Sequence, residues 1–560
     1  MAKYVLVSDP TLTSPYRNFP LLDFLPCAPA HLVPKQVYKF LKGPLGPTYP
    51  NGELKHAPYS VRKIEAALLT KNKREDVAVP RDDYLQNFIK DDTEVIAIST
   101  MDPLGIGPVT MSYYALFGGA LDPWVRLEWD QLLTKINKLR EGKKAKLLVG
   151  GPGVWEFTVL REEVDKYKID YLFQGESDDI VTELFEQVSL DTIDTNMFYK
   201  GHFSYDERMK RYYKNDDKFI SKGLTQRTFP KLEEIPTIVK PAVKGMVEIM
   251  RGCGIGCDFC EVTLRPLRYY ELDNVLKEIK VNVEGGFSNV WMHSDEFFGF
   301  KHGPQFVPNE EALTGLVSNI MSVPGITRTN PTHGRISIPA GYPELMKKLS
   351  EIMRAGPNNW IGVQTGVETG SERLAKIHMP NKTLPLRIGP DGSWQEIVWE
   401  GVNVETKYFW RPAFTVQVGQ ASETPEDNWE TVALINRLSN SYVDGRPFEF
   451  TITPLLNVPL GMIRARHIDE SGMLTQDQLA VYFAAYRHLA KMATRNANKD
   501  ASGNALVKMG MSNMISWGGK LLLRIIESRA KKSGLNIEKL KEWGTGNEKI
   551  TSETILAKNL

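Results

Sequence analysis

Apolar and polar positions alternate with two different periods along the first 190 residues of this 560-residue chain. Short β-type runs predict strands, and stretches with a helical period predict helices that cover them. The expected strands lie at residues 4–7, 94–99, 146–149 and 170–173, and the clearest helices at 61–69, 129–139 and 178–187. Because strands and helices alternate, we expect residues 1–190 to form a doubly wound α/β domain.

The same alternation resumes after a polar connector, residues 191–240, which is rich in Asp, Lys and Tyr. Six strands are expected at residues 247–250, 290–293, 335–338, 360–367, 414–418 and 449–453. The helices expected between them lie at residues 273–283, 310–321, 343–354, 372–377 and 426–438. These patterns predict a second α/β domain over residues 241–464. Amphipathic stretches at 475–490 and 520–532 predict a helical C-terminal region over residues 465–560.

Two segments interrupt the regular alternation. Residues 10–58 contain ten prolines, which forbid long helices and central strands over much of this length. We interpret the segment either as a lid over a cofactor face or as a structural loop that wraps the domain. Residues 379–412 carry five large aromatic side chains in a connection longer than the strands require. A substrate surface and the core packing of an extra helix both explain these rings, and we favour core packing for most of them.

The carboxyl ends of the first four expected strands carry small and polar residues. In doubly wound sheets, ligands bind beyond these ends, and glycine lets the backbone approach a bulky, flat ligand because it has no Cβ atom. The candidate binding residues are Ser8, Asp9, Ser99, Thr100, Met101, Gly150, Gly151, Pro152, Gly175 and Glu176. A dinucleotide-type G-x-G-x-x-G does not follow the first strand, which weakens a dinucleotide site. Another nucleotide-binding or a purely structural domain remains the alternative.

Three cysteines, Cys253, Cys257 and Cys260, lie within eight residues in a C-x-x-x-C-x-x-C spacing after an apolar run. Three thiolates on one loop can hold three irons of a [4Fe–4S] cluster and leave the fourth iron open. The alternative is a structural zinc site, but zinc normally takes four protein ligands, and only the distant Cys27 or His293 is available as a fourth. We expect Cys27 to be uninvolved. Four cysteines are too few for a disulfide framework.

Composition narrows the classes of function. The formal net charge is +1, so no overall field attracts the chain to nucleic acid or to an anionic membrane. No apolar run approaches the roughly 18 residues that span a bilayer, and the first residues lack the apolar core of a signal peptide. Since an oxygen-labile cluster needs a reducing compartment, we expect a cytoplasmic enzyme that binds neither nucleic acid nor membrane.

The cysteine spacing, with Phe259 before the last cysteine, closely resembles the signature of the radical S-adenosylmethionine (SAM) family. The resemblance implies that the open iron binds SAM and that SAM is cleaved to a deoxyadenosyl radical. It also implies SAM contacts from Phe259, from Asp295 and Glu296 after the second strand, and from Glu368 and Ser371 after the fourth. For Asp295 and Glu296, helix capping is the alternative.

The strand ends of residues 1–190 resemble the cobalamin-binding domain that precedes the barrel in some members of that family. The likeness lies in the Ser99-Thr100 pair, the Gly150-Gly-Pro152 turn and the Gly175-Glu176 pair. It implies a Rossmann-like cobalamin-binding domain, a partial (β/α)6 radical SAM barrel and a helical C-terminal region. The D-x-H-x-x-G sequence of many cobalamin proteins is absent, so cobalamin is expected with its own base displaced from cobalt.

Together these resemblances imply a cobalamin-dependent radical SAM C-methyltransferase that uses methylcobalamin. The layout is most similar to archaeal members that methylate a glutamine of methyl-coenzyme M reductase. The expected partners are therefore that enzyme's alpha subunit and an external electron donor. A small-molecule C-methyltransferase, a cobalamin-dependent radical cyclase and a non-catalytic iron–sulfur redox or sensor module are the alternatives. A methylthiotransferase is disfavoured, because that group needs a second cysteine triad upstream.

Overall fold

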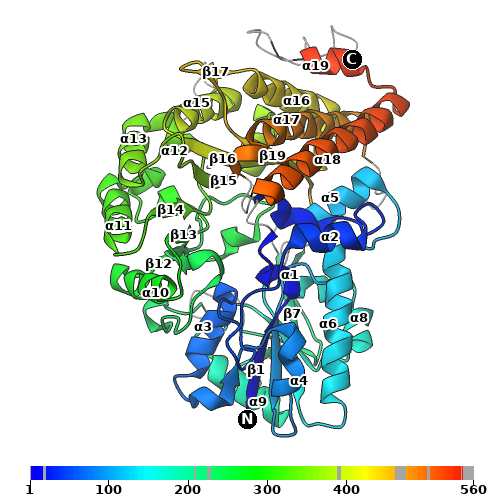
Figure 1. Cartoon of the computed structure of the whole chain (residues 1–560), viewed down its shortest axis with the longest axis vertical. Coiled ribbons are helices and arrows are strands. Elements are labelled where there is room, and N and C mark those ends of the chain that lie inside the picture. The colour runs from blue at the N-terminus through cyan, green and yellow to red at the C-terminus, as the bar shows by residue number, and fades with distance from the viewer. Residues whose placement is uncertain are drawn as a thin grey trace.

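The computed structural model describes residues 2–16, 20–206, 210–222, 229–386, 393–458, 460, 474–500, 505–543 and 545. Two α/β units lie against each other: the first fills the lower half of Figure 1, and the second lies above it and to the left. Long C-terminal helices cover the second unit. The predicted α/β class is therefore confirmed.

The first unit is built on a seven-stranded sheet with the order β2-β1-β3-β4-β5-β9-β6. All neighbouring strands are parallel except β6, which runs antiparallel to β9. The strands are β1 (Tyr4–Ser8), β2 (Val77–Ala78), β3 (Val95–Ser99), β4 (Lys146–Gly150), β5 (Tyr171–Gln174), β6 (Tyr199–Lys200) and β9 (Phe219–Ser221). The four predicted strands are confirmed to within a residue at each end. The last two strands of the sheet come from the predicted connector, so the sheet runs beyond residue 190.

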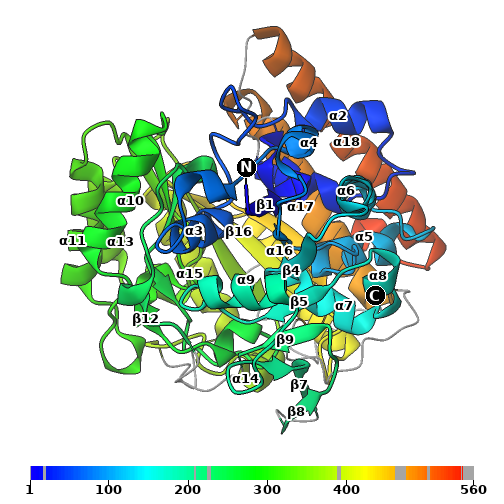
Figure 2. The ribbon, with the colours of Figure 1, turned by 90° about the horizontal axis from the view of Figure 1, so that it is seen from below.

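Helices cover both faces of this sheet because alternate side chains of each strand point to opposite faces. Val5 and Val7 pack in one buried cluster with Trp129 and Leu133 of α6 (Trp124–Arg140). Tyr4 and Leu6 pack in another with residues of α3 (Tyr59–Leu68) and α9 (Val181–Leu190). Figure 2 looks along the strands and shows α3 and α9 on one side of the sheet and α6 on the other. The predicted doubly wound arrangement is thus confirmed.

The described residues of the second unit form six parallel strands in two three-stranded sheets. An isolated parallel bridge between His333 and Gln364 links the two sheets into an open arc. The strands are β10 (Met246–Glu248), β13 (Asn289–His293), β14 (Arg328–Pro331), β15 (Ile361–Glu368), β16 (Trp410–Val418) and β19 (Thr451–Leu456). The helices around them are α10 (Leu272–Glu284), α11 (Glu310–Ser322), α12 (Ser337–Gly341), α13 (Pro343–Ile352), α14 (Glu372–His378), α15 (Trp394–Lys407) and α16 (Pro425–Ser439). This arrangement agrees with the predicted partial barrel of six strands.

The predicted third strand at 335–338 is wrong. That segment leads into the short helix α12, where Ile336 and Ile338 are buried in different clusters, and the true third strand is β14. β14 has no apolar alternation because its buried polar groups are satisfied by neighbouring strands. Thr329 donates to the Val290 carbonyl, and Asn330 accepts from the Gly362 amide. Tertiary hydrogen bonds here replace the hydrophobic pattern that the prediction relied on.

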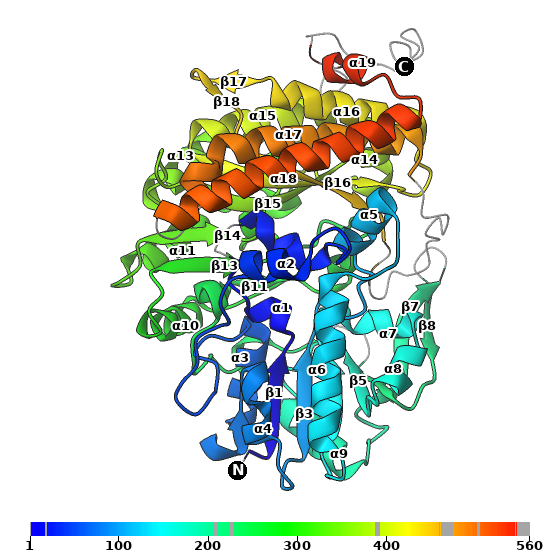
Figure 3. The same cartoon turned by 45° about the vertical axis from the view of Figure 1, so that its right-hand side comes forward.

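The two irregular segments pack as short helical elements. The proline-rich segment folds into α1 (Pro10–Thr13), a 3₁₀ helix (Pro20–Cys27) and α2 (Lys35–Lys42), which lie between the upper edge of the first sheet and the C-terminal helices (Figure 3). In the segment 379–412, α15 packs against α12, and both Trp394 and Trp410 are fully buried. Core packing therefore accounts for these two rings. Residues 17–19 and 387–392 lie outside the described residues.

The C-terminal region is helical, as predicted. It contains α17 (Gln476–Asp500), α18 (Ala505–Lys532) and α19 (Ile537–Glu542). Residues of α17 share the buried cluster of β16, β19 and α16, so this region completes the core of the second unit. Within the described residues, none of the helices combines the length and the apolar character that crossing a membrane requires.

Candidate active site

The carboxyl ends of the strands of both units lie at their shared boundary. Glu176 and Asp178 follow β5 in the first unit and form ion pairs with Arg251, which follows β10 in the second. Ser112, in α5 (Pro108–Phe117) after β3, accepts a hydrogen bond from the Leu456 amide at the end of β19. The two edges that were predicted to bind cofactors are thus brought together by the fold.

Polar groups at the edge of the first sheet are buried without partners. Ser8, Asp9 and Thr100 are each at most 5% exposed. Among the described residues, Ser8 Oγ, Asp9 Oδ2 and Thr100 Oγ1 have no hydrogen-bond partner. Unsatisfied buried polar atoms are costly, and they concentrate at sites that receive a ligand. Their position at the carboxyl ends of β1 and β3 fits the edge predicted to bind a cofactor.

The same edge depends on glycine for its shape. A Cβ atom on Gly151, whose φ is +95°, would lie 2.7 Å from the Thr100 carbonyl oxygen and 2.9 Å from its nitrogen. A Cβ atom on Gly153 would lie 2.5 Å from the Met101 carbonyl oxygen. The turns after β3 and β4 therefore touch backbone to backbone. Beside them the Met101 side chain is 56% exposed, and Gly175, with φ +120°, faces open space.

Asp9 should make the stability of the ligand-free protein pH-dependent. Burial raises its pKa to about 6 from an ordinary 3.8, although hydrogen bonds from Thr11 oppose the shift. The folded state therefore favours the protonated Asp9 carboxyl group. The resulting stabilisation is complete below pH 3.8 and is lost as the pH rises through about 6. At about 1.4 kcal/mol per pKa unit, roughly 2–3 kcal/mol should disappear over this interval.

The measurement is the urea midpoint of the cofactor-free protein at pH 5.0, 6.0 and 7.5. Replacing Asp9 by Asn keeps the acceptor for Thr11 and removes the buried charge. Asp9→Asn should therefore be more stable than the wild-type protein at pH 7.5, and the two should converge as the pH falls. Parallel pH profiles for the two proteins would contradict this assignment.

The three predicted cluster ligands lie on one loop, which begins directly after β11 (Met250–Arg251). Glycines flank Cys253 on both sides and precede Cys257. These glycines, Gly252, Gly254 and Gly256, have φ values of +82°, +74° and +84°. These values favour glycine, so the tight path of the loop requires these residues. All three cysteines are free thiols, and Cys257 is buried.

Residues outside the loop hold it in place at three points. The Gly252 amide donates to Asp295 Oδ2 at 2.7 Å, and Asn381 Nδ2 donates to the Ile255 carbonyl at 3.0 Å. Asp258 lies 2.9 Å from Nδ1 of His378, whose Nε2 lies 2.7 Å from the Ala421 carbonyl oxygen. Each ring nitrogen of His378 therefore faces an acceptor oxygen, one from the cysteine loop and one from the chain after β16.

The loop chemistry fits a three-cysteine cluster. Burial raises the pKa of all three thiols, that of Cys257 to about 11, and the Lys382 ammonium partly offsets the effect at Cys257 and Cys260. Across the described part of the chain, no three His, Cys, Asp or Glu side chains converge as they would around a metal ion. The donor set itself, three thiols on a glycine-rich loop, suits iron and sulfide.

Asp295 and Glu296 hold neighbouring structure. Asp295 fixes the start of the cysteine loop through Gly252. Glu296 caps the 3₁₀ turn Phe297–Gly299 by accepting from the Phe298 amide, and it forms a buried ion pair with Arg335 at 3.2 Å. The alternative of helix capping is thus realised at Glu296, and its predicted SAM contact remains a prediction.

Glu368 lies at the end of β15 and has a left-handed backbone conformation, which is more usual for glycine. Its φ is +64°, and the pairing of β15 with β16 shifts register between Gly366 and Glu368. The carboxylate accepts from Gln417 Nε2 at 2.8 Å and pairs with the buried Lys382 ammonium at 3.1 Å. A non-glycine residue held at positive φ by several contacts is typical of functional sites.

Ser371 and Phe259 are held by contacts with other parts of the second unit. Ser371 is fully buried and caps α14, with its hydroxyl donating to Asp427 at 2.5 Å. Phe259 is partly buried and packs against the core cluster of β16 and α17. Direct SAM contacts from these two residues remain predictions.

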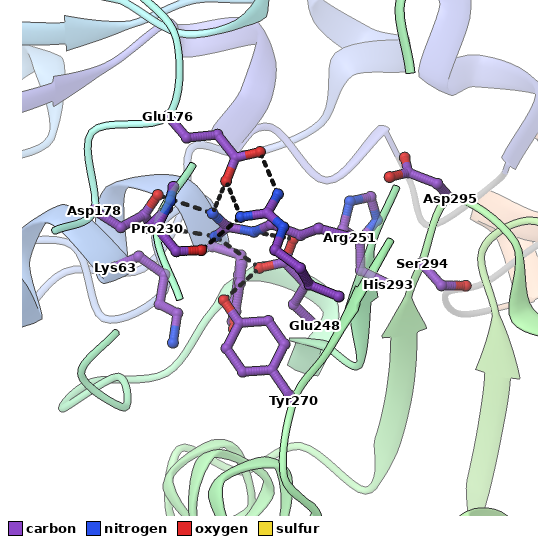
Figure 4. Close-up of polar contacts among 12 residues, drawn as sticks. Lys63, Glu176, Asp178, Pro230, Glu248, Arg251, Tyr270, His293, Ser294 and Asp295 are labelled. Carbon is purple, nitrogen blue, oxygen red and sulfur yellow. Dashed lines mark hydrogen bonds and ion pairs between the residues drawn. The ribbon is translucent and has the colours of Figure 1, made fainter. Parts of the chain in front are cut away.

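Charged residues that the sequence did not single out meet at the boundary between the two units (Figure 4). We call them the interdomain charge cluster: Glu176, Asp178, Glu248, Arg251 and Arg268. Arg251 contacts all three carboxylates at 2.7–2.9 Å. Arg268 contacts Glu176 at 2.7 Å and 3.1 Å. Glu176, predicted as a cobalamin contact, is therefore engaged by two arginines of the other unit.

Comparisons with known proteins relate this chain, at low identity, to a curated enzyme and to a solved structure. No protein-family model matches it. It is similar to a curated tRNA-2-methylthio-N(6)-dimethylallyladenosine synthase from Sulfurihydrogenibium sp. (strain YO3AOP1), with 23% identity over 239 residues. This match covers 41% of the chain and 47% of that enzyme, so the chain spans about half of the length of the curated relative it matches.

Two solved structures of TsrM, a radical SAM methyltransferase from Kitasatospora setae, are also similar at 14% identity. One holds cobalamin and a [4Fe–4S] cluster, and the other holds tryptophan substrate and the SAM analogue aza-SAM. Each match covers 81% of this chain, with 75% and 73% of the respective TsrM chains and TM-scores of 0.46 and 0.48.

Proposed function

We propose that the chain is a cobalamin-dependent radical SAM C-methyltransferase. One observation carries the proposal. A loop with three cysteines in C-x-x-x-C-x-x-C spacing meets, at one boundary, the glycine-rich edge of a doubly wound sheet with unpartnered buried polar atoms. When bound, the cluster with SAM supplies a hydrogen-abstracting deoxyadenosyl radical, and methylcobalamin supplies the methyl group.

The residues of the second unit bind and orient the cluster and SAM. Cys253, Cys257 and Cys260 ligate three irons, and the thiols must lose their protons as the cluster loads, since only thiolates are ligands. Lys382 and Glu368 form a buried ion pair beside Cys257 and Cys260. A SAM molecule on the open iron would find complementary charges here for its amino and carboxylate groups.

The residues of the first unit hold cobalamin. Gly150 ends β4, Gly151 and Pro152 follow it, and Ser8, Asp9, Ser99 and Thr100 supply polar groups at the same edge of the sheet. Met101 offers an exposed apolar side chain at the same edge. The protein contributes orientation and the exclusion of water, while the cofactors supply the chemistry. An sp³ carbon carries no lone pair or charge, so the central step needs no protein acid or base.

The methyl acceptor that we propose is a side-chain carbon of a protein or peptide, namely a glutamine in the alpha subunit of methyl-coenzyme M reductase. The helices of the proline-rich segment and of the C-terminal region extend the surface near the boundary on one face of the molecule, where Figure 3 shows α1 and α2 below α18. A small substrate would not need this area. An external electron donor supplies the electrons.

The test compares a peptide that spans the glutamine with free glutamine, each under anaerobic conditions with SAM, methylcobalamin and a strong reductant. Remote contacts hold a peptide in place and speed the reaction at its target residue, so free glutamine should turn over poorly. We expect a gain of one methyl group on the peptide glutamine, read by mass spectrometry. An unmodified peptide alongside efficient methylation of a small metabolite would support a small-molecule methyltransferase instead.

A non-catalytic iron–sulfur module and a cobalamin-dependent radical cyclase are the remaining alternatives. The reduced protein should release deoxyadenosine from SAM, which a redox or sensor module without turnover would not do. A cyclase would form deoxyadenosine and leave its product without an added methyl group. Product mass and deoxyadenosine together therefore separate the three possibilities.

A further inference from the structure

The cysteine loop is closed at its base by two arginines that face each other. The strands β11 (Met250–Arg251) and β12 (Arg268–Tyr269) form an antiparallel ladder on either side of the loop. In that ladder Arg251 is paired directly with Arg268. Like charges opposite each other on neighbouring strands are destabilising. Without further charges, the base of the loop would therefore tend to open.

Carboxylates from the first unit neutralise this pair of arginines. Glu176, which follows β5 and Gly175, accepts hydrogen bonds from Arg251 at 2.7 Å and from Arg268 at 2.7 Å and 3.1 Å. Asp178 accepts from Arg251 at 2.9 Å. One carboxylate at the edge of the first sheet thus joins both ends of the cysteine loop. Figure 4 shows Glu176 and Asp178 of the first unit beside Arg251 of the second.

The contacts are shielded from solvent, which strengthens them. The five side chains of the cluster are only 9–15% exposed. Burial by itself would raise the pKa of Asp178, yet the Arg251 guanidinium holds that pKa below its usual value. Tyr270 and Glu248 complete the cluster from within the second unit, with a 3.0 Å hydrogen bond between them. Buried ionic groups of this kind are best attested as devices that fix register.

We propose that the interdomain charge cluster fixes the distance and orientation between the cysteine loop and the cofactor edge of the first sheet. Its members are positioning residues, and the proposal rests on the proposed function. Because hydrogen abstraction and methyl delivery must reach the same carbon from two cofactors, a small change in this distance should uncouple the two events. Misplacement of reacting groups by about 1 Å can cost on the order of 100-fold in rate.

The experiment uses the full-length protein, loaded anaerobically with the cluster and cob(II)alamin. The variant Arg268→Met removes one guanidinium of the clamp and leaves every predicted cofactor contact unsubstituted, including its own partner Glu176. Pulsed dipolar EPR measures the distance between the reduced cluster and cob(II)alamin, and a parallel assay measures deoxyadenosine formed per methyl group transferred. We expect Arg268→Met to bind both cofactors and to give a broader or shifted distance distribution. Methyl transfer should fall about 10-fold or more, while deoxyadenosine formation falls less.

Two further variants separate positioning from general stability. Glu278→Gln breaks the buried ion pair with Lys63, which joins the same two units through α3 and α10 and lies outside the cysteine loop. It should cost stability and leave the distance unchanged. Arg268→Lys keeps the charge and should restore part of the coupling.

An unchanged distance and unchanged coupling in Arg268→Met would overturn the proposal. So would a shift of equal size in Glu278→Gln. If Arg268→Met fails to fold, Arg268→Lys decides by the same two readouts. Failure of the wild-type protein to load either cofactor would instead refute the proposed function, which keeps the two outcomes distinct.

Discussion

Replacing Cys253, Cys257 and Cys260 together by alanine should abolish iron binding and SAM cleavage. The three thiols are the only cysteines on this loop, and the remaining cysteine of the chain, Cys27, lies in the first unit. Thiolates hold [4Fe–4S] clusters, and alanine cannot replace them. Iron content, the visible absorption of the reconstituted protein and deoxyadenosine release measure the effect.

Cys27→Ala is the matched control. Cys27 lies in the 3₁₀ helix Pro20–Cys27 of the first unit, and burial raises the pKa of its thiol. This variant should keep its iron and its SAM cleavage. Stoichiometric zinc in the wild-type protein, with no iron taken up on reconstitution, would contradict the cluster assignment.

Gly151→Val should destabilise the first unit and prevent stoichiometric binding of cobalamin. The new Cβ atom would meet the Thr100 backbone at 2.7 Å and 2.9 Å, where two strand ends touch and neither can move aside easily. A β-branched residue at φ +95° adds backbone strain. Together these effects should cost about 3 kcal/mol or more. Urea unfolding and cobalamin titration provide the measurements.

The control is Gly142→Val. Gly142 follows α6, its φ of +73° is also positive, and a Cβ atom added there would have no neighbour within 4 Å. It imposes the same kind of backbone strain without the clash, so it should cost only about 1–2 kcal/mol and leave cobalamin binding intact. Equal losses of stability in the two variants would contradict this account. They would show that backbone strain alone, and not the close approach of the two strand ends, makes glycine necessary at position 151.

The sequence predicted the fold where hydrophobic alternation and burial agree. The strands before residue 190 were located closely because their side chains point alternately into two apolar clusters. The third strand of the second unit was misplaced, since β14 is held by hydrogen bonds of Thr329 and Asn330 that leave no apolar pattern. The strands β9 and β6 also escaped prediction, because they lie in a polar segment whose pairing with β5 depends on tertiary structure.

The site was predictable only where its signal is local. The cysteine spacing can be read from eight consecutive residues. The glycines after β4 are likewise close together in the sequence. The charge cluster is different, because Glu176 and Arg251 are 75 residues apart and their attraction appears only when the two units pack. The same holds for Glu368, whose partners Gln417 and Lys382 come from other elements. Arg251, directly before the cysteine loop, is the one local hint that was available.

The central claim is that two cofactors act on one carbon, and isotope transfer tests it most directly. The protein is loaded with methylcobalamin that carries a ¹³C methyl group and is given the glutamine peptide with deuterium on the target carbon. Product and deoxyadenosine from a single turnover are then analysed by mass spectrometry. We predict one ¹³C methyl group on that carbon, with one deuterium in each deoxyadenosine formed. A methylated product without deuterium in deoxyadenosine, or deuterated deoxyadenosine with no label gained by the peptide, would contradict it.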